Sequence, residues 1–343
     1  MSRYQQSATS SDHKVSIIGT TTWGTTLGII LARKGIPVAI ITRTEHEARE
    51  LSIERKHDRF LPGVDIPQSI YFSHDINVIK DYQDLVIIAV PSDRFRHNVQ
   101  WIKKSLTQGS LILSVTKGLE LPNGKRMSQI LKEELPLEFH PDICSLSGPN
   151  LAKEIVDYKP ASTVVAGSND TNTARIQNIL MSPTFRVYTS SDLVGLELCG
   201  TLKNILALGV GISDGLNIGD NGKSTLITRG LAEIRRLGVA AGGEAGTFYV
   251  LAGLGDIIAT CSSPFSRNRY VGERLAQGQS LTDIQTSMQN VAEGVNTTRA
   301  ALEMAHSFGI EMPITQAIYS VLFEHLSPID AIQELMSRPA RSE

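Results

Sequence analysis

From Lys14 onward, short runs of β-branched residues alternate with helical patterns. The run KVSII at residues 14–18 precedes a helical pattern over residues 23–34, which Gly35 ends, and the run PVAIIT follows. Further apolar runs lie at residues 85–90, 110–115, 143–146, 163–166 and 185–188. Continuous apolar strands of this kind suit a sheet that is covered on both faces. The pattern predicts an α/β fold with a doubly wound sheet.

The pattern changes after about Ser191, where strands give way to one helix after another. A chain of 343 residues has room for two domains. We therefore expect a flexible tail at residues 1–13, a sheet domain at residues 14–190 and a helical domain at residues 191–343. The longest apolar stretch, residues 193–212, contains Glu197, Lys203 and Asn204, so we do not expect it to span a membrane.

Charge and cysteine content exclude several classes of protein. There are 33 Lys and Arg against 35 Asp and Glu, so nothing attracts nucleic acid globally, and any anion site must be a local cluster. Cys144, Cys199 and Cys261 are far apart and form neither a CxxC pair nor a Cys/His spacing, so we predict no metal site and no disulfide framework. This cysteine usage favours a reducing compartment. A homodimer is left open.

The first strand leads into a loop, GTTTWG, that opens a helix. A helix N-terminus after a strand suits a pyrophosphate, and the spacing is that of G-x-G-x-x-G. Gly19 and Gly24 take the first and third glycine positions, but Thr21 takes the middle one. Its side chain must either point away from the cofactor or loosen the contact. A tight turn without any ligand is the alternative reading.

The end of the second strand bears on which dinucleotide is used. An Asp or Glu there would bind the ribose of NAD, but the residues are Thr42, Arg43 and Thr44. Arg43 could pair with a 2′-phosphate instead, which favours NADPH. The alternative is a solvated surface arginine.

One lysine lies in an almost wholly apolar helical segment, LVGLELCGTLKNILALGVGI. Lys203 and Glu197 are six residues apart, about 240° around a helix, so they cannot form the usual i to i+4 pair. Lys203 must find another partner, face a cavity or extend to the surface. Burial of an unpaired ammonium lowers its pKa, which suits proton transfer near neutral pH. Asn204 offers a neighbouring amide.

Farther along, polar donors gather after a Gly-Leu-Gly turn. Asp256 stands between apolar residues, where an acid is usually paired. Ser266, Arg267 and Asn268 then bring a hydroxyl, a guanidinium and an amide to a helix start, which suits a phosphate. A capped helix with a solvated basic face is the alternative.

Two loops of the sheet domain also carry polar groups. TKGLE contains Lys117 beside Gly118, and SGPN contains Ser147, Gly148 and Asn150. Both follow strands, and open α/β sheets bind ligands at the carboxyl ends of their strands. Each could also be a plain turn.

Together these segments resemble the bacterial NAD(P)-dependent glycerol-3-phosphate dehydrogenases. The resemblance rests on the loop at residues 19–28 and on ordered motifs along nearly the whole chain: RFLPG, AVPS, TKGLE, SGPNLAKE, LKNILALGVGISDGL, KSTLITRGLAEI, GLGDIIATCSSPFSRNR and VAEGV. It implies a Rossmann-like N-terminal domain and an all-helical C-terminal domain like that of 6-phosphogluconate dehydrogenase. It also implies reduction of dihydroxyacetone phosphate to sn-glycerol 3-phosphate for phospholipid synthesis, in the cytoplasm.

The resemblance also assigns residues to roles. The catalytic set would be Lys203, as the proton-transfer residue, with Asp256 and Asn204. The cofactor, NADPH or NADH, would be held by Gly19, Thr22, Trp23, Gly24, Arg43, Lys117, Ala152, Arg267, Val291 and Glu293. The substrate would be held by Lys117, Gly148, Asn150, Lys203, Asp256, Ser266, Arg267 and Asn268.

Two other functions remain open on the sequence. The first is a related two-domain NADP-dependent hydroxy acid dehydrogenase, against which the SRNR cluster argues, because a carboxylate substrate needs no second phosphate-sized site. The second is a catalytically silent NADP(H)-binding sensor, suggested by Thr21, against which Lys203, Asn204 and Asp256 argue.

Overall fold

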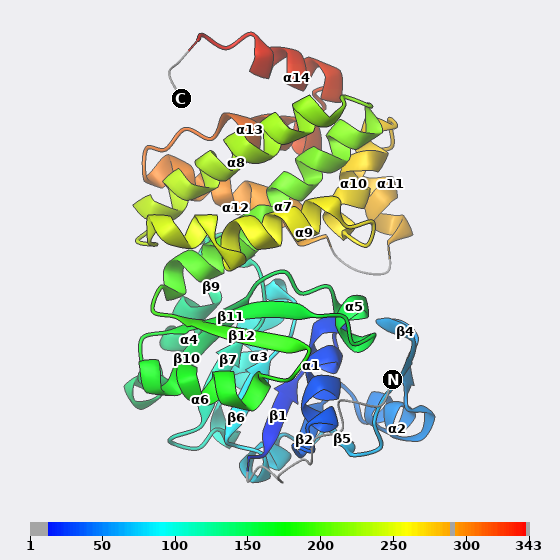
Figure 1. Cartoon of the computed structure of the whole chain (residues 1–343), viewed down its shortest axis with the longest axis vertical. Coiled ribbons are helices and arrows are strands. Elements are labelled where there is room, and N and C mark those ends of the chain that lie inside the picture. Colours follow the sequence, from blue (N-terminus) through cyan, green and yellow to red (C-terminus); the bar gives the residue numbers. More distant parts are fainter. Residues whose placement is uncertain (1–12, 289–291, 341–343) are drawn as a thin grey trace. The chain divides into compact units, whose positions relative to one another are not determined.

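The computed structural model describes residues 13–288 and 292–340 and divides into two compact units (Figure 1). The first unit holds the chain up to Lys117 together with Arg126–Leu193, and the second holds Gly118–Lys125 and Val194–Glu343. The excursion at residues 118–125 was not part of the single boundary expected near residue 190. Residues 1–12 of the expected tail lie outside the described residues.

An eight-stranded sheet forms the centre of the first unit. Its strands are β1 (Val15–Ile18), β2 (Val38–Ile41), β5 (Ile70–Ser73), β6 (Leu85–Ile88), β7 (Leu111–Ser114), β10 (Ile143–Ser147), β11 (Ala161–Gly167) and β12 (Phe185–Ser190). They lie in the order β12-β11-β10-β7-β6-β1-β2-β5. Six strands from β5 to β10 are parallel, and β11 runs antiparallel to β10. The parallel part has the order 3-2-1-4-5-6 of a doubly wound, Rossmann-type sheet.

The two faces of this sheet are both buried, which explains the apolar runs in the sequence. Ile17 packs into one hydrophobic cluster and its neighbour Ile18 into another. The helices of the unit are α1 (Thr22–Arg33), α2 (Glu45–Glu54), α3 (Phe95–Ile102), α4 (Met127–Glu134), α5 (Ala152–Val156) and α6 (Asp170–Leu180). A small hairpin, β3 (Lys56–His57) and β4 (Leu61–Asp65), follows α2. The strands predicted from the sequence are confirmed. Strand β5 was not predicted, and neither were the short strands β3, β4, β8 (Leu119–Glu120) and β9 (Lys125–Arg126).

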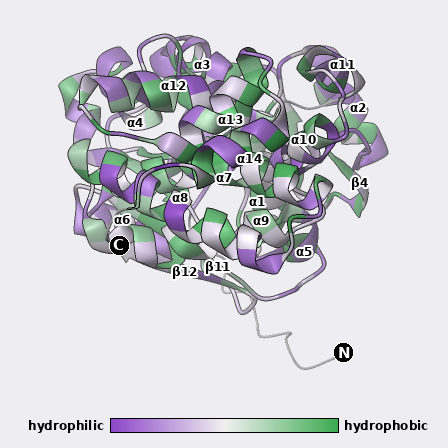
Figure 2. Ribbon diagram, turned by 90° about the horizontal axis from the view of Figure 1, so that it is seen from above, coloured by the Kyte–Doolittle hydropathy of each residue, from purple (hydrophilic) through white to green (hydrophobic). Residues whose placement is uncertain are grey.

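After Leu193, the described part of the chain forms helices and no strand. The α-helices are α7 (Leu193–Gly215), α8 (Asp220–Ala240), α9 (Asp256–Ser262), α10 (Arg267–Ala276), α11 (Leu281–Ser287), α12 (Glu293–Ser307), α13 (Pro313–Phe323) and α14 (Pro328–Met336). Hydrophilic and hydrophobic residues alternate along the ribbons (Figure 2). Leu193–Gly215 and Ala245–Ser262 are apolar and long enough to cross a membrane by length and composition. In α7, however, 89% of the apolar window is buried, as in the central helix of a folded core.

Two glycines bring α7 and α10 into backbone contact. A Cβ atom on Gly211 would lie 2.0 Å from the carbonyl oxygen of Arg269, and one on Gly272 would lie 2.1 Å from that of Leu208. Any side chain at either position would force the helices apart. The contact therefore fixes the position of α10 against α7.

A buried carboxylate ties α8 to the start of α13. Glu233 is 3% exposed, and its Oε1 accepts a hydrogen bond from the Ile314 backbone N–H at 2.7 Å. Its Oε2 accepts from the backbone N–H and the hydroxyl of Thr315, both at 3.2 Å. Burial raises the pKa of Glu233, against the effect of these hydrogen bonds. The carboxylate thus satisfies N–H groups that the helix itself leaves unpaired.

Candidate active site

The loop between β1 and α1 needs glycine at two positions. Gly19 has φ = +100°, and a Cβ atom there would lie 2.7 Å from the Ala89 carbonyl oxygen. At Gly24, a Cβ atom would lie 2.6 Å from the Gly19 carbonyl oxygen. The chain therefore turns tightly from the central strand into the N-terminus of α1. This geometry leaves backbone N–H groups of the first helical turn available to an anion.

Thr21 replaces the middle glycine without directing its hydroxyl outward. Its Oγ1 donates to the Ala89 carbonyl oxygen at 2.8 Å and accepts from the Gly24 N–H at 3.2 Å. It is the N-cap residue of α1. Of the two possibilities for this side chain, the structure shows a hydroxyl bonded to the protein's own backbone.

Thr22 and Trp23, both predicted to contact the cofactor, also make contacts within the protein. The Thr22 hydroxyl donates to the Phe60 carbonyl oxygen at 2.9 Å, which ties the helix start to the RFLPG segment. The Trp23 ring packs against Phe185, with ring centroids 6.2 Å apart. Its buried Nε1 has no acceptor within the described residues. Trp23 thus retains an unsatisfied donor near the loop.

The end of β2 is contacted by a carboxylate that the sequence did not indicate. Arg43 is exposed, and its guanidinium makes no hydrogen bond or ion pair with any residue that the structure describes. Its backbone N–H donates to Oε2 of Glu47 at 3.1 Å. The other oxygen of Glu47 accepts from the hydroxyl of Thr20, in the nucleotide loop, at 2.5 Å. A carboxylate therefore joins the end of β2 to the loop after β1.

The SGPN loop at the end of β10 is braced by β11. The Asn150 amide donates to Thr163 Oγ1 at 2.9 Å, and Thr163 in turn donates to the Ser147 carbonyl oxygen at 3.1 Å. Lys117 Nζ donates to the Gly148 carbonyl oxygen at 3.2 Å. Oδ1 of Asn150 is buried and has no partner among the described residues. The structure thus places the predicted site residues Lys117, Gly148 and Asn150 at this loop, and Lys117 contacts Gly148 directly.

Lys203 lies within the second unit and is only 7% exposed. Its Nζ forms an ion pair with Oδ1 of Asp256, which is 1% exposed, and also contacts Oγ1 of Thr260 at 2.5 Å. Thr260 is 3.2 Å from the same Asp256 oxygen. Of the alternatives considered for Lys203, the structure shows burial against a partner rather than extension to the surface. Asp256 and Thr260 are four residues apart on α9 and share a face.

A chain of amides crosses three helices beside this ion pair. Asn268 Nδ2, on α10, donates to Oδ1 of Asn204 on α7 at 3.0 Å. Oδ1 of Asn268 accepts from the Gly294 N–H, in the first turn of α12, at 2.9 Å. A Cβ atom on Gly294 would lie 2.8 Å from that oxygen, so glycine is needed here. The predicted catalytic and substrate residues Asn204 and Asn268 are therefore in direct contact.

The remaining predicted residues lie at helix starts. Ser266 caps α10 and accepts from the Arg269 N–H at 3.3 Å, while Arg267 begins that helix and is exposed. Glu293 begins α12 and Ala152 begins α5. Val291 lies outside the described residues.

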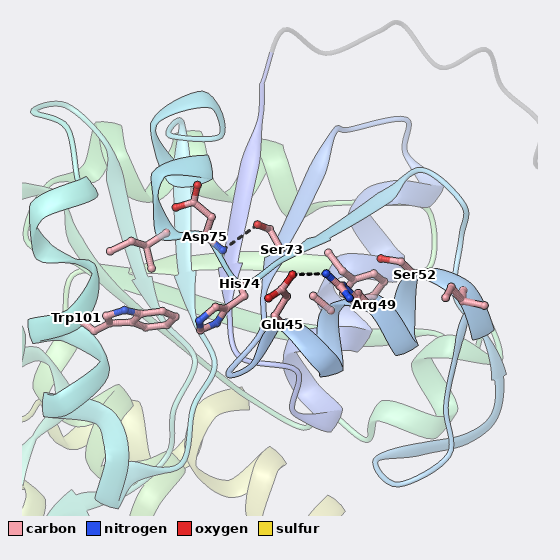
Figure 3. A pocket seen from close by; sticks show the side chains of 11 residues that line it. Glu45, Arg49, Ser52, Ser73, His74, Asp75 and Trp101 are labelled. Carbon is pink, nitrogen blue, oxygen red and sulfur yellow. Dashed lines mark hydrogen bonds and ion pairs between the residues drawn. The ribbon is translucent and has the colours of Figure 1, made fainter.

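A pocket of about 670 Å³ lies elsewhere in the first unit, against one face of α2 (Figure 3). In this pocket Arg49 pairs with Glu45 at 2.6 Å, and the His74 and Trp101 rings lie 6.0 Å apart between centroids. None of the predicted site residues that the structure describes lines this pocket.

Three polar residues of the site were not predicted: Thr260, Thr163 and Glu47. The signal for Thr260 was its spacing of four from Asp256 on one helix. Thr163 and Glu47 are brought in by strand and helix packing, which the sequence pattern does not encode. Within residues 13–288 and 292–340, no group of three or more His, Cys, Asp or Glu side chains is arranged to hold a metal ion.

The first unit fits a bound dinucleotide on its own geometry. The glycines allow the tight turn into α1, and the start of α1 presents backbone N–H donors that suit a pyrophosphate. The buried Nε1 of Trp23 and Oδ1 of Asn150 remain unsatisfied among the described residues. Buried polar groups usually have partners, so these two atoms are consistent with a ligand.

Comparison with known proteins agrees with this geometry. The model of the N-terminus of NAD-dependent glycerol-3-phosphate dehydrogenase matches residues 14–174, and that of the C-terminus matches residues 192–333. A glycerol-3-phosphate dehydrogenase (NAD(P)+) of Dehalococcoides mccartyi is 48% identical over 336 residues, covering 96% of this chain and 92% of that protein. One from Prosthecochloris aestuarii is 41% identical over 329 residues, covering 96% and 99%.

Solved structures give the same picture. The crystal structure of glycerol-3-phosphate dehydrogenase from Coxiella burnetii has a TM-score of 0.89 and 34% identity, covering 95% of this chain and 99% of that one. A ketopantoate reductase from Ralstonia eutropha shares the fold alone, with a TM-score of 0.59, 17% identity, and coverage of 93% and 99%. With family models matching in both units and relatives above 40% identity over nearly the full length, the chain belongs to the NAD-dependent glycerol-3-phosphate dehydrogenase family.

Proposed function

We propose that this enzyme reduces dihydroxyacetone phosphate to sn-glycerol 3-phosphate, reversibly, with NADH or NADPH. The single observation that carries the proposal is the buried Lys203–Asp256 pair in a chain of this family. A buried ion pair adds little to the stability of a fold on average, so stability by itself does not explain why this pair is present. In a dehydrogenase, it supplies the proton that reduction of a carbonyl requires.

The cofactor supplies the hydride when bound, and the first unit would hold it. The start of α1, with Gly19 and Gly24, suits the pyrophosphate, and Arg43 is available to the adenosine end. Lys117, Ala152, Arg267, Val291 and Glu293 are assigned to the cofactor by the family resemblance.

Lys203 would hold and donate the proton at Nζ. As hydride reaches the carbonyl carbon, the oxygen gains negative charge, which an ammonium both stabilises and protonates. Asp256 and Thr260 contact Nζ and so fix its position. In the reverse direction, neutral Lys203 accepts the alcohol proton. Positioned acid–base groups of this kind contribute about 10²- to 10⁴-fold in rate.

The start of α10 would hold the substrate phosphate. Arg267 offers a planar fork of donors, and the helix N-terminus adds a favourable dipole. Asn268 is already held by Asn204 and Gly294, so its amide is preorganised. Binding energy from the phosphate then aligns the reacting carbonyl. Lys117, Gly148, Asn150 and Ser266 complete the proposed substrate set.

The test is oxidation of NADPH or NADH, followed by absorbance, with dihydroxyacetone phosphate or with ketoacids as substrate. Lys203→Ala should lower kcat by at least about 10²-fold and leave cofactor binding nearly unchanged. Lys223→Ala, which removes a lysine paired with Asp214 in the same unit, is the control. Near-normal turnover of the Lys203 variant would refute the role. Turnover of ketoacids alone would support a hydroxy acid dehydrogenase, and no turnover at all would support a silent sensor.

We further propose a cytoplasmic enzyme that supplies phospholipid synthesis. Its three cysteines all lie in the described part of the chain. They are buried, and none of them forms a disulfide. The homodimer stays a prediction, which sedimentation velocity can test.

A further inference from the structure

Helix α2 places a carboxylate, that of Glu47, at the end of β2, where the strand itself has no Asp or Glu to bind a ribose. Glu47 lies in the first turn of α2, six residues after β2 ends at Ile41. Its two oxygens nevertheless accept from the backbone N–H of Arg43 and from the hydroxyl of Thr20. These segments, the end of the second strand and the loop after the first, are the ones that hold the adenosine ribose in doubly wound sheets.

Helix capping alone does not account for this position. Thr44 and Glu47 have the spacing of a capping box, in which the glutamate would bind the N–H of the capping residue itself. Here Glu47 binds the N–H one residue earlier, at Arg43, and also reaches a separate loop at Thr20. The side chain is thus directed toward the nucleotide loop and away from the α2 face that carries Glu45 and Arg49.

We propose that Glu47 sets the cofactor preference of this enzyme by accepting a hydrogen bond from the adenosine ribose of NADH and by opposing the 2′-phosphate of NADPH. The inference rests on the proposed function. It assigns Glu47 and Arg43 opposite effects at the same end of the cofactor. Arg43 favours the phosphate, and Glu47 favours the hydroxyl.

The chemistry of the carboxylate supports both halves of this assignment. An ionised carboxylate has about four lone-pair sites, and only two are used by Thr20 and Arg43. A ribose hydroxyl can donate to one of the others. A 2′-phosphate is mostly deprotonated at neutral pH and carries about 1.5 to 2 negative charges, so a carboxylate repels it at contact distance.

Thr20 is a positioning residue in this arrangement. It follows Gly19 directly, is 7% exposed, and holds one carboxylate oxygen of Glu47. Without its hydroxyl, that oxygen loses its only contact with the loop in the described structure, and the carboxylate can turn toward solvent. Loss of Thr20 Oγ1 should therefore shift cofactor preference in the same direction as loss of the charge, by less.

The experiment measures dissociation constants of NADH and NADPH by calorimetry, without substrate, for the wild type and three variants. Glu47→Gln should tighten NADPH binding about tenfold and leave NADH binding within about threefold. Thr20→Val should change the ratio of the NADH and NADPH dissociation constants about threefold, also in favour of NADPH. Glu54→Gln is the matched control, because it removes the same charge from the exposed end of α2, about 10 Å along the helix.

Each outcome supports or refutes the role of Glu47 in cofactor preference. A ratio within twofold of wild type in Glu47→Gln, or an equal shift in Glu54→Gln, refutes the role of Glu47 while leaving the proposed function intact. Failure of the wild type to bind either cofactor refutes the proposed function, and this inference with it. If Glu47→Gln does not fold, as judged by its thermal transition, an unchanged ratio in Thr20→Val refutes the proposal.

Discussion

Replacing Asp256 by Asn removes one charge from the buried pair and changes little else. The Lys203 ammonium keeps Thr260 as a hydrogen-bond partner but loses its counter-charge. Both side chains of the pair are almost wholly buried, so water cannot replace the lost carboxylate. The variant thus measures the cost of removing one charge from this buried pair.

The expected loss follows from that burial. Breaking a buried ion pair by removing one partner costs about 3–5 kcal/mol, and the amide that replaces the carboxylate places Asp256→Asn at about 3 kcal/mol. For a unit of this size, that lowers Tm by about 6–12 °C.

Calorimetric or circular dichroism melts of four proteins complete a double-mutant cycle: wild type, Asp256→Asn, Lys203→Met and the double variant. If the pair is coupled, the double variant is more stable than the sum of the two single losses implies, by about 1–3 kcal/mol. Additive losses, or a loss below about 1 kcal/mol for Asp256→Asn at pH 7, would refute the reasoning.

Three further predictions concern other parts of the molecule. Glu233→Ala leaves the N–H groups at the start of α13 unpaired and should lower the free energy of unfolding in urea by about 2–3 kcal/mol. Glu233→Gln should lower it by less, because the amide keeps an acceptor. Equal losses in the two variants would contradict the capping role. Gly24→Ala places a Cβ atom 2.6 Å from a backbone oxygen and should weaken NADPH binding at least about tenfold in a fluorescence titration, whereas Gly246→Ala, where nothing lies within 4 Å, should not. Burial raises the pKa of Cys144 and of Cys261 to about 12, so iodoacetamide at pH 8 should label neither thiol, as read by mass spectrometry, until the protein is unfolded.

Most of the fold could be predicted from the sequence because the sheet is buried on both faces. The central strands β1, β6 and β7 are four residues long, mostly apolar and buried at every position, as expected for a sheet covered on both faces. Strand β5, IYFS, was missed although its residues favour strands; it lies at the sheet edge, where Tyr71 is half exposed. The excursion at residues 118–125 was missed because unit membership depends on contacts with distant residues, such as the Gly118 N–H with Thr201.

The candidate site was predictable where one residue conflicted with its surroundings. A lone lysine in an apolar helix indicated Lys203, but its partner Asp256 is 53 residues away, and only folding joins them. The direction of Thr21 depends on the Ala89 carbonyl of a neighbouring strand. Glu47 was missed because a ribose-binding carboxylate is expected at the end of β2, whereas here the first turn of α2 supplies it.

The backbone contact between α7 and α10 has a consequence for substrate choice. Lys203 lies on α7 and Arg267 begins α10, and Gly211 and Gly272 leave no room for these helices to slide or separate. The distance between the backbones that carry the proposed proton donor and the proposed phosphate donor is therefore set by main-chain contact. On these proposed roles, the enzyme should select substrates whose carbonyl lies a fixed number of bonds from the phosphate. Repacking of side chains elsewhere in the helical unit cannot change this backbone distance.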